Sequence, residues 1–392
     1  MTCSQFICIS KTRPFATSTR PEPDTSSMAQ SPPKKKRAPA PLRPSSSIVL
    51  LSPTNQVLLL HRVKTSKSFA AAHVFPGGNL DAFHDGELPN LSTPEVHQDS
   101  AAYRLGAIRE CFEETGILLA RPKGSSSPDT TSATSLIDVS EAERETARRR
   151  VHDNEVRFGD WVDSVGGTPD VQGLMPFTRW ITPANVGRRF TTQMYLYMIP
   201  DGGSGAGGEA REMTIPTPDG GVEHTAALFD DASAWLARAA SGDDILFPPQ
   251  VFLLHLVNRF CSGSSTPPPA GPPTAVREHY QAQRQALADF LRATPTSTAA
   301  HPSSAIPWAE KVMSPHSLFV RGSDDRIVLG LERPGPELRG SARGGDYERV
   351  VLARFTGEGP RRVEVRSRDE VFREHRAEEQ EAEAARKDEP KL

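Results

Sequence analysis

Three glutamates lie within five residues of the segment 109–119, whose sequence is RECFEETGILL. Glu110, Glu113 and Glu114 are spaced i, i+3 and i+4, so a helix would bring their carboxylates to one face. Like charges at this spacing repel one another unless the face lies in bulk water or binds a positive partner. Hard divalent cations such as Mg²⁺ and Mn²⁺ prefer carboxylate oxygens, often together with substrate phosphates. The cluster therefore indicates either a metal site or a solvated helix face.

The segment around the glutamates is predicted to be a helix over residues 99–115, ended by Gly116. The apolar side of its helical wheel is made by Ala101, Leu105, Ile108 and Phe112. The glutamates fall on the opposite side, and none of them has a lysine four residues later to relieve the repulsion. This favours the metal site, although periodicity alone does not exclude a merely solvated face.

Residues 109–117 resemble the second half of the Nudix box, REUxEExGU, in which U is an aliphatic residue and Cys111 stands at the first U. The first half of that box opens on a glycine after a strand, which Gly77 and Gly78 in VFPGG supply. The usual box has a glutamate six residues after the glycine. Here 30 residues separate Gly78 from Arg109, and Ala101 stands where that glutamate would fall. The chain thus resembles the Nudix hydrolase superfamily, with its first-half glutamate unassigned.

The long insertion and its flanking segments resemble one branch of the superfamily, which contains a coenzyme A diphosphatase. These segments are LLLHRVKTSKSFAAAHVFPGGNLD and PFTRWITPANVGRRFTTQMYLYMIP, and the resemblance covers roughly residues 46–263. It implies metal-dependent hydrolysis of the diphosphate bond of a nucleoside diphosphate derivative, with coenzyme A or acyl-coenzyme A as the expected substrate. The alternatives are a nucleotide sugar, ADP-ribose or dinucleotide pyrophosphatase, and a Nudix module that senses a ligand without catalysis.

The resemblance also implies roles for single residues. Glu110, Glu113 and Glu114 are expected to hold Mg²⁺ or Mn²⁺, with the Gly78 carbonyl as a further ligand and Arg109 orienting one of the glutamates. The structural alternatives are a surface ion pair for Arg109 and an ordinary tight turn for the glycines.

The general base and the substrate-binding residues are expected from other segments. Glu223 is the candidate base, and Glu209 and Glu212 compete with it. The basic candidates for phosphate binding are Lys64 and Lys67, for a 3′-phosphate, and Arg188 and Arg189, as a bidentate clamp or a solvated strand end. Trp180 and Phe190 either stack on a base or pack in the core.

Composition shifts divide the chain into four parts. They are a tail over 1–45, an α/β body over 46–263, a Pro-rich linker over 264–274, and a helix with short strands and a charged end over 275–392. The body is predicted to be a mixed-sheet α/β/α sandwich of the Nudix type with inserted helices. An exposed helix rich in Glu and Arg is expected within residues 140–164, and the C-terminal part is expected to be a small α+β extension.

The overall charge excludes strong electrostatic attraction to nucleic acid or membranes. The 46 basic and 49 acidic residues give a net charge of -3. No apolar stretch approaches the roughly 20 residues needed to cross a bilayer. The four cysteines show no CxxC or zinc-type spacing. We therefore expect a small nucleotide as partner, without nucleic acid or membrane, and no feature indicates the oligomeric state.

The two ends of the chain carry several candidate targeting signals. The segment before Glu22 is basic, rich in hydroxyl residues and without acids, as in a mitochondrial transit peptide. The final Pro-Lys-Leu is similar to the peroxisomal Ser-Lys-Leu signal, and PPKKKR is a basic run of the nuclear-import type. We expect a soluble intracellular protein whose N-terminal segment is a plain disordered tail, with a mitochondrial or a peroxisomal location as the alternatives.

Overall fold

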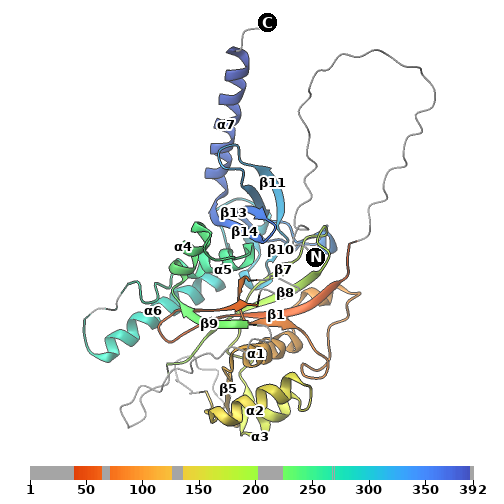
Figure 1. Cartoon of the computed structure of the whole chain (residues 1–392), viewed down its shortest axis with the longest axis vertical. Helices are drawn as coiled ribbons and strands as arrows, with labels where there is room; N and C mark the ends of the chain where they lie inside the picture. The colour runs from red at the N-terminus through yellow and green to blue at the C-terminus, as the bar shows by residue number, and fades with distance from the viewer. Residues whose placement is uncertain are drawn as a thin grey trace, which may run out of the picture.

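The computed structural model describes residues 39–63, 71–125, 136–201, 224–266, 268 and 270–388. A mixed sheet of eight strands forms its centre, in the order β10-β7-β8-β1-β2-β3, with β4 paired to β1 and β9 paired to β2 (Figure 1). The strands are β1 (Leu42–Leu51), β2 (Val57–Arg62), β3 (His73–Val74), β4 (Gly77–Asn79), β7 (Met175–Ile181), β8 (Arg189–Met198), β9 (His224–Asp230) and β10 (Val312–Met313). A separate pair is formed by β5 (Ala120–Pro122) and β6 (Gly167–Pro169).

Strands β1 and β8 form the middle of the main sheet. They run parallel and pair continuously from Leu42 with Arg189 to Leu51 with Met198. Their other neighbours, β2 and β7, are antiparallel to them. Strand β1 is buried from Ser45 to its end, which requires a covering layer on each face of the sheet.

Helices supply both covering layers. Because successive side chains of a strand point to opposite faces, Ile48 and Leu50 pack with one set of helices and Val49 and Leu51 with the other. The first set is α1 (Ala101–Thr115), α2 (Glu141–His152) and α3 (Phe158–Ser164), and the second is α4 (Ala232–Ser241), α5 (Pro248–Asn258) and α6 (Pro273–Arg292). Figure 1 shows α1, α2 and α3 below the sheet and α4 and α5 above it. The predicted α/β class is confirmed.

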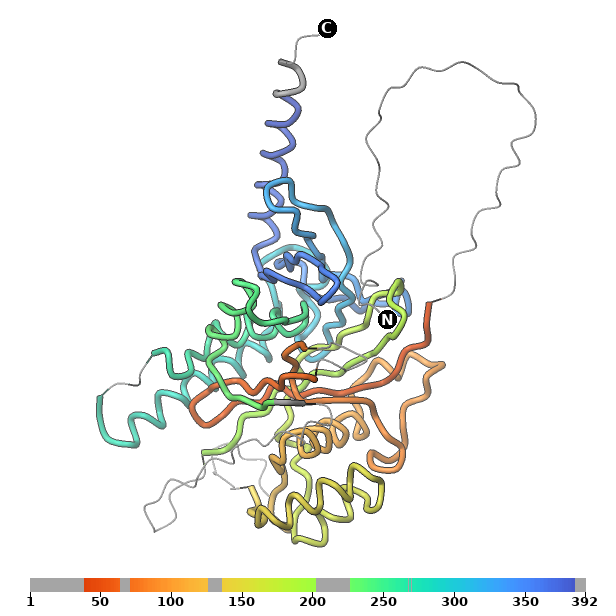
Figure 2. Tube along the Cα trace, viewed as in Figure 1, coloured from red at the N-terminus to blue at the C-terminus, as the bar shows by residue number. Residues whose placement is uncertain are grey.

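The chain after α6 forms a second, antiparallel sheet in the order β11-β12-β13-β14. Its elements are β11 (His316–Val320), β12 (Ile327–Leu331), β13 (Asp346–Thr356) and β14 (Gly359–Ser367), followed by α7 (Arg368–Asp388). Leu329, Val351 and Val363 of this sheet share one hydrophobic core with α4 and α5. Strand β10 also pairs with β7 of the main sheet, so the core continues past the predicted linker. Among the described elements, α7 extends away from the body toward the C-terminus (Figure 2).

Three boundaries differ from the sequence prediction. Strand β1 begins at Leu42 rather than at Ser46, because its pairing with β8 extends to that residue. The Glu- and Arg-rich segment forms two helices, because the chain turns after α2 through Asn154, whose φ is 57°. The segment ALFDDASAWLARAA predicts a helix from residue 227, but residues 227–230 belong to β9 and α4 begins at Ala232.

Cys111 and Cys261 are both buried and free. Cys3 and Cys8 lie outside the described residues. In the described ranges, no helix combines the length and the apolar character that crossing a membrane requires.

The insertion between β4 and α1 is fastened to the main sheet around His97. Its ring Nδ1 lies 2.9 Å from the Thr191 hydroxyl on β8. The neighbouring Val96 carbonyl accepts hydrogen bonds from the Tyr103 hydroxyl and from Arg179. Burial lowers the pKa of His97 to about 4, and the charge of Arg179 acts in the same direction. His97 is therefore neutral in the folded protein at neutral pH.

Acid is expected to weaken the fold through His97. The unfolded chain takes up a proton at the ordinary histidine pKa of 6.5, and folded His97 only at about 4. The effect of His97 on the free energy of unfolding is absent well above pH 6.5 and grows as the pH falls from about 6.5 to about 4. At pH 5.5 it lowers the free energy of unfolding by roughly 1.4 kcal/mol. Urea unfolding at pH 7.5 and 5.5 should show a smaller loss for His97→Gln than for wild type. Exposed His152→Gln is the control, and equal losses in all three proteins would contradict the prediction.

Candidate functional site

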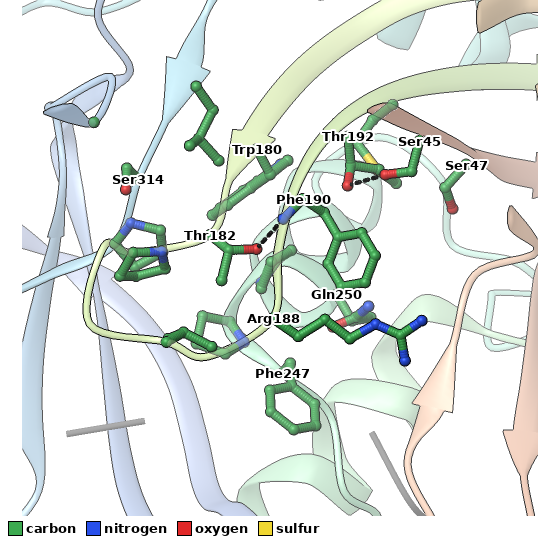
Figure 3. Close-up of a pocket in the computed structure, with 18 of the residues that line it drawn as sticks. Ser45, Ser47, Trp180, Thr182, Arg188, Phe190, Thr192, Phe247, Gln250 and Ser314 are labelled. Carbon is green, nitrogen blue, oxygen red and sulfur yellow. Dashed lines mark hydrogen bonds between the residues drawn. The ribbon is translucent and has the colours of Figure 1, made fainter. Parts of the chain in front are cut away.

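One large cavity, of about 2220 Å³, is lined by residues of both sheets (Figure 3). Part of its wall comes from β1, β4 and α1, and part from the turn between β7 and β8. Further parts of the wall come from four segments, within 245–250, 314–317, 333–343 and 355–361. The chain after α6 thus contributes to the cavity, which the sequence did not predict.

Arg109 on α1 is the centre of a buried ion-pair network beside this cavity. Its Nε and Nη2 donate to the two carboxylate oxygens of Asp85, each at 3.0 Å. Its Nη1 donates to Glu110 at 2.9 Å and to Glu113 at 2.8 Å. The Asn79 carbonyl accepts from Nη2 as well. Burial opposes the charge of Arg109, but Glu110, Asp85 and Glu113 outweigh it and raise its pKa above the usual value. The guanidinium therefore stays charged and fixed.

The cavity wall beside Arg109 carries two of the glutamates and the glycine turn. Gly77 N–H donates to Glu114 at 2.7 Å. A Cβ on Gly78 would lie 2.5 Å from the carboxylate of Glu110, so any side chain there would force that carboxylate to move. Burial raises the pKa of Glu110 to about 7, against the opposing effect of Arg109. The turn and the acidic helix are thus packed against each other.

Glu113 faces away from the cavity wall, toward α2. Its second oxygen lies 3.3 Å from Nδ1 of His152. Arg148 of α2 donates through Nε and Nη2 to the Glu113 main-chain carbonyl. This carbonyl lies in the last turn of α1, where a cation is favourable. The α2 helix therefore holds the end of α1 that carries the glutamates.

Comparison with known proteins identifies this arrangement. Residues 88–240 match the family model of the NUDT19 Nudix domain. The chain contains a Nudix domain. Putative nudix hydrolase 7 of Caenorhabditis elegans is 30% identical over 160 residues, 41% of this chain and 45% of that protein. Acyl-coenzyme A diphosphatase NUDT19 of Gallus gallus is 28% identical over 251 residues, 54% of this chain and 62% of that protein. The chain spans about half the length of the curated relatives it matches.

A solved structure also matches the chain. The crystal structure of a NUDIX hydrolase from Alicyclobacillus acidocaldarius covers 55% of this chain and 90% of its own, at 24% identity and a TM-score of 0.42.

The Nudix domain has the donor types that a divalent cation prefers. Glu110 and Glu114 present carboxylates at the cavity wall, and the absence of a side chain at Gly78 keeps space beside Glu110. Within the described ranges, no three His, Cys, Asp or Glu side chains already form a metal site. Arg109 and the Gly77 N–H each engage a glutamate oxygen instead. A carboxylate has a second oxygen, so these contacts leave Glu110 able to act as a ligand.

The structure separates the two arginines predicted to clamp a phosphate. Arg188 lies at the cavity beside Phe190 and Gln250 (Figure 3). Arg189 is buried, donates to the carbonyls of Thr182 and Pro183, and lies 2.6 Å from Glu337. The prediction of a joint clamp is wrong, because Arg189 is used to hold the start of β8.

Two further groups of predicted site residues are the aromatic residues and those outside the described part of the chain. Trp180 lines the cavity but packs against Phe252 and donates to Thr178, so its ring belongs to the core. The remaining candidates lie outside the described residues: Lys64, Lys67, Glu209, Glu212 and Glu223.

Asp85 is the residue that the sequence analysis missed. It accepts hydrogen bonds from Nε and Nη2 of Arg109, and its side chain is fully buried. It lies seven residues after Gly78, one beyond the usual position of the first-half glutamate. A search for any acid close to that position, rather than for a glutamate at a fixed spacing from Arg109, would have found it.

Removing the charge of Asp85 is expected to destabilise the Nudix domain. Asp85→Asn leaves Arg109 buried with an amide facing one of its donors, and breaking a buried ion pair costs about 3–5 kcal/mol. The free energy of unfolding, from urea titration at pH 7.5, should fall by that amount. Asp163→Asn is the matched control, because Asp163 is 66% exposed and its pair with Lys123 is worth at most about 1 kcal/mol. Similar losses in both variants would count against the central role of Asp85.

Proposed function

We propose that this Nudix domain hydrolyses the diphosphate bond of coenzyme A or an acyl-coenzyme A, with Mg²⁺ or Mn²⁺ as cofactor. One observation carries the proposal. Buried Arg109 fixes Glu110 beside the Gly77–Gly78 turn, at the wall of a cavity of about 2220 Å³. Ligand sites commonly have volumes of roughly 300–1,000 Å³, so this cavity leaves room for a large nucleotide.

The names of the relatives support the same substrate class. The relatives from Gallus gallus and Homo sapiens are both acyl-coenzyme A diphosphatases by name, each 28% identical to this chain over the matched residues. The family match over residues 88–240 includes both glutamates that face the cavity, Glu110 and Glu114. We therefore carry their substrate class over to this chain as a proposal.

The chain's own residues have separable tasks in this reaction. Glu110, Glu114 and the Gly78 carbonyl would hold the cation, which would neutralise the diphosphate oxygens and polarise the phosphorus. Glu113, the third glutamate expected as a ligand, faces α2 and is not placed in this set. Arg109 holds the carboxylates of Glu110 and Glu113 in place, and its charge opposes the protonation of Glu110. We keep Glu223 as the proposed base, which would accept the proton of the attacking water.

The test is product formation by the full-length protein with Mg²⁺ or Mn²⁺. Coenzyme A, acetyl-coenzyme A, ADP-ribose, NADH and UDP-glucose are supplied in parallel, and products are identified by mass spectrometry. We expect coenzyme A to give a phosphopantetheine product. Glu110→Gln should lower kcat/KM by more than the roughly 10–100-fold typical of residues outside the ligand shell.

Other outcomes would redirect the proposal. Turnover of only a nucleotide sugar, a dinucleotide or ADP-ribose would keep the hydrolase and refute the coenzyme A assignment. An absence of turnover with every substrate, in wild type and Glu110→Gln alike, would favour a module that binds its ligand without catalysis.

The close contact of Gly78 with Glu110 gives a second test. In Gly78→Ala the new Cβ would push the Glu110 carboxylate aside, because the two would otherwise be 2.5 Å apart. The Mg²⁺ concentration for half-maximal turnover should rise by roughly 10–100-fold. Gly159→Ala on α3 is the matched control, since its Cβ would meet no atom within 4 Å. Unchanged metal dependence in Gly78→Ala would remove Gly78 from the proposed site.

We also propose a mitochondrial or peroxisomal location, from the end sequences alone. Both candidate signals lie outside the described residues, within 1–38 and 389–392. Fluorescent fusions at either end, compared with markers of both organelles, would test it.

A further inference from the structure

The loop between β12 and β13 brings a concentration of positive charge to the cavity. Its residues 333–343 read RPGPELRGSAR, with three arginines and a single acid, Glu337. That acid lies 2.6 Å from Arg189, so it already forms an ion pair with a residue outside the loop. Arg333, Arg339 and Arg343 all line the cavity. We name this segment the arginine loop.

Packing fixes the arginine loop against the main sheet. Leu338 is buried in a small cluster with Ile181 of β7 and Val312 of β10. Glu337 adds its ion pair to Arg189 at the start of β8. The loop therefore sits beside the β7–β8 turn, from which Arg188 lines the same cavity.

Two arginines of the loop have no acidic partner in the described part of the chain. Arg333 lies 3.8 Å from Glu332, but no carboxylate lies within ion-pair distance of Arg339 or Arg343 among the described residues. The Nε of Arg343 is buried and has no acceptor there. Burial lowers the pKa of Arg343; the charge of Glu310 opposes this shift, and repulsion from Arg179 adds to it. An anion bound at this place would supply the acceptor that the buried Nε lacks and an ion pair for the two guanidinium groups.

This basic end of the cavity is well separated from the acidic end. Gly78 pairs with Ser46, and Ser46 pairs with Gln193, which is four residues after the start of β8. With a rise of about 3.3 Å per residue and a strand spacing of about 4.8 Å, the start of β8 lies roughly 16 Å from Gly78. A diphosphate held at Glu110 and Glu114 cannot reach the arginine loop by itself. A ligand that uses both ends needs a second anionic group.

We propose that Arg339 and Arg343, together with Arg188 on the neighbouring turn, bind a second phosphate of the substrate, separate from the diphosphate that is cleaved. The inference rests on the proposed function and names its substrate class as nucleoside diphosphate derivatives that carry a further phosphate on the ribose. Planar guanidinium groups bind phosphate oxygens in pairs, which gives both charge and geometric selection. The arginine loop is then a specificity element for the Nudix site.

The substrate test compares two molecules that differ only in that phosphate. For the full-length enzyme we measure kcat/KM with coenzyme A and with 3′-dephospho-coenzyme A. Wild type is expected to prefer coenzyme A by about 100-fold, and Arg339→Gln/Arg343→Gln should abolish the preference by lowering kcat/KM for coenzyme A alone. A double variant that keeps the preference, or that loses both substrates equally, would overturn the proposal.

The control variant removes the same charge elsewhere. Arg150→Gln/Arg292→Gln changes two arginines that are 51% and 60% exposed and do not line the cavity. It should leave the preference of wild type unchanged. A loss of preference in this control as well would show that net charge, and not the arginine loop, selects the substrate.

A binding measurement separates this inference from the proposed hydrolysis. Calorimetry without metal compares adenosine 3′,5′-bisphosphate with adenosine 5′-monophosphate, neither of which contains a diphosphate. Wild type should bind the bisphosphate about 100-fold more tightly, and Arg339→Gln/Arg343→Gln should bind both alike. This result would support the arginine loop even if no substrate were hydrolysed. Equal affinities in wild type, or no binding of the bisphosphate, would refute it.

Discussion

The buried charge of Arg109 is the constraint on which the site depends. A guanidinium that is only 4% exposed is unfavourable unless carboxylates and carbonyls surround it. Asp85 from the insertion, Glu110 and Glu113 from α1, and the Asn79 carbonyl after the glycine turn meet this need. Two segments distant in sequence, residues 79–85 and helix α1, are thereby held in one arrangement. The same contacts that stabilise the charge set the positions of the candidate metal ligands.

The parts of the fold that depend on local sequence could be predicted. Helix α1 and its end follow from apolar periodicity and from Gly116, which adopts the left-handed conformation with a φ of 72°. The parallel pairing of β1 with β8 could not be predicted, because it joins residues 147 positions apart and no local pattern encodes that partner. The addition of β10 to the edge of the main sheet was hidden for the same reason.

The same holds for the site residues: those marked by a local sequence pattern could be predicted, and those defined by contacts between distant segments could not. The glutamates of α1 were found because their spacing is itself the signal. Asp85 was missed because its contact with Arg109 depends on the path of the long insertion. Arg189 was misassigned, since the sequence does not reveal that Glu337, 148 residues later, takes its charge. The arginine loop was overlooked because nothing near it in the sequence indicates a cavity.

The position of β10 gives the C-terminal part a protective role as well. Strand β7 is covered by β10 along part of its outer edge, and the apolar side of α4 and α5 is covered by the second sheet. A chain ended at residue 263 would uncover strand hydrogen-bonding groups and apolar surface together, the combination that promotes association between copies. Residues 264–388 therefore serve solubility of the Nudix domain in addition to shaping its cavity.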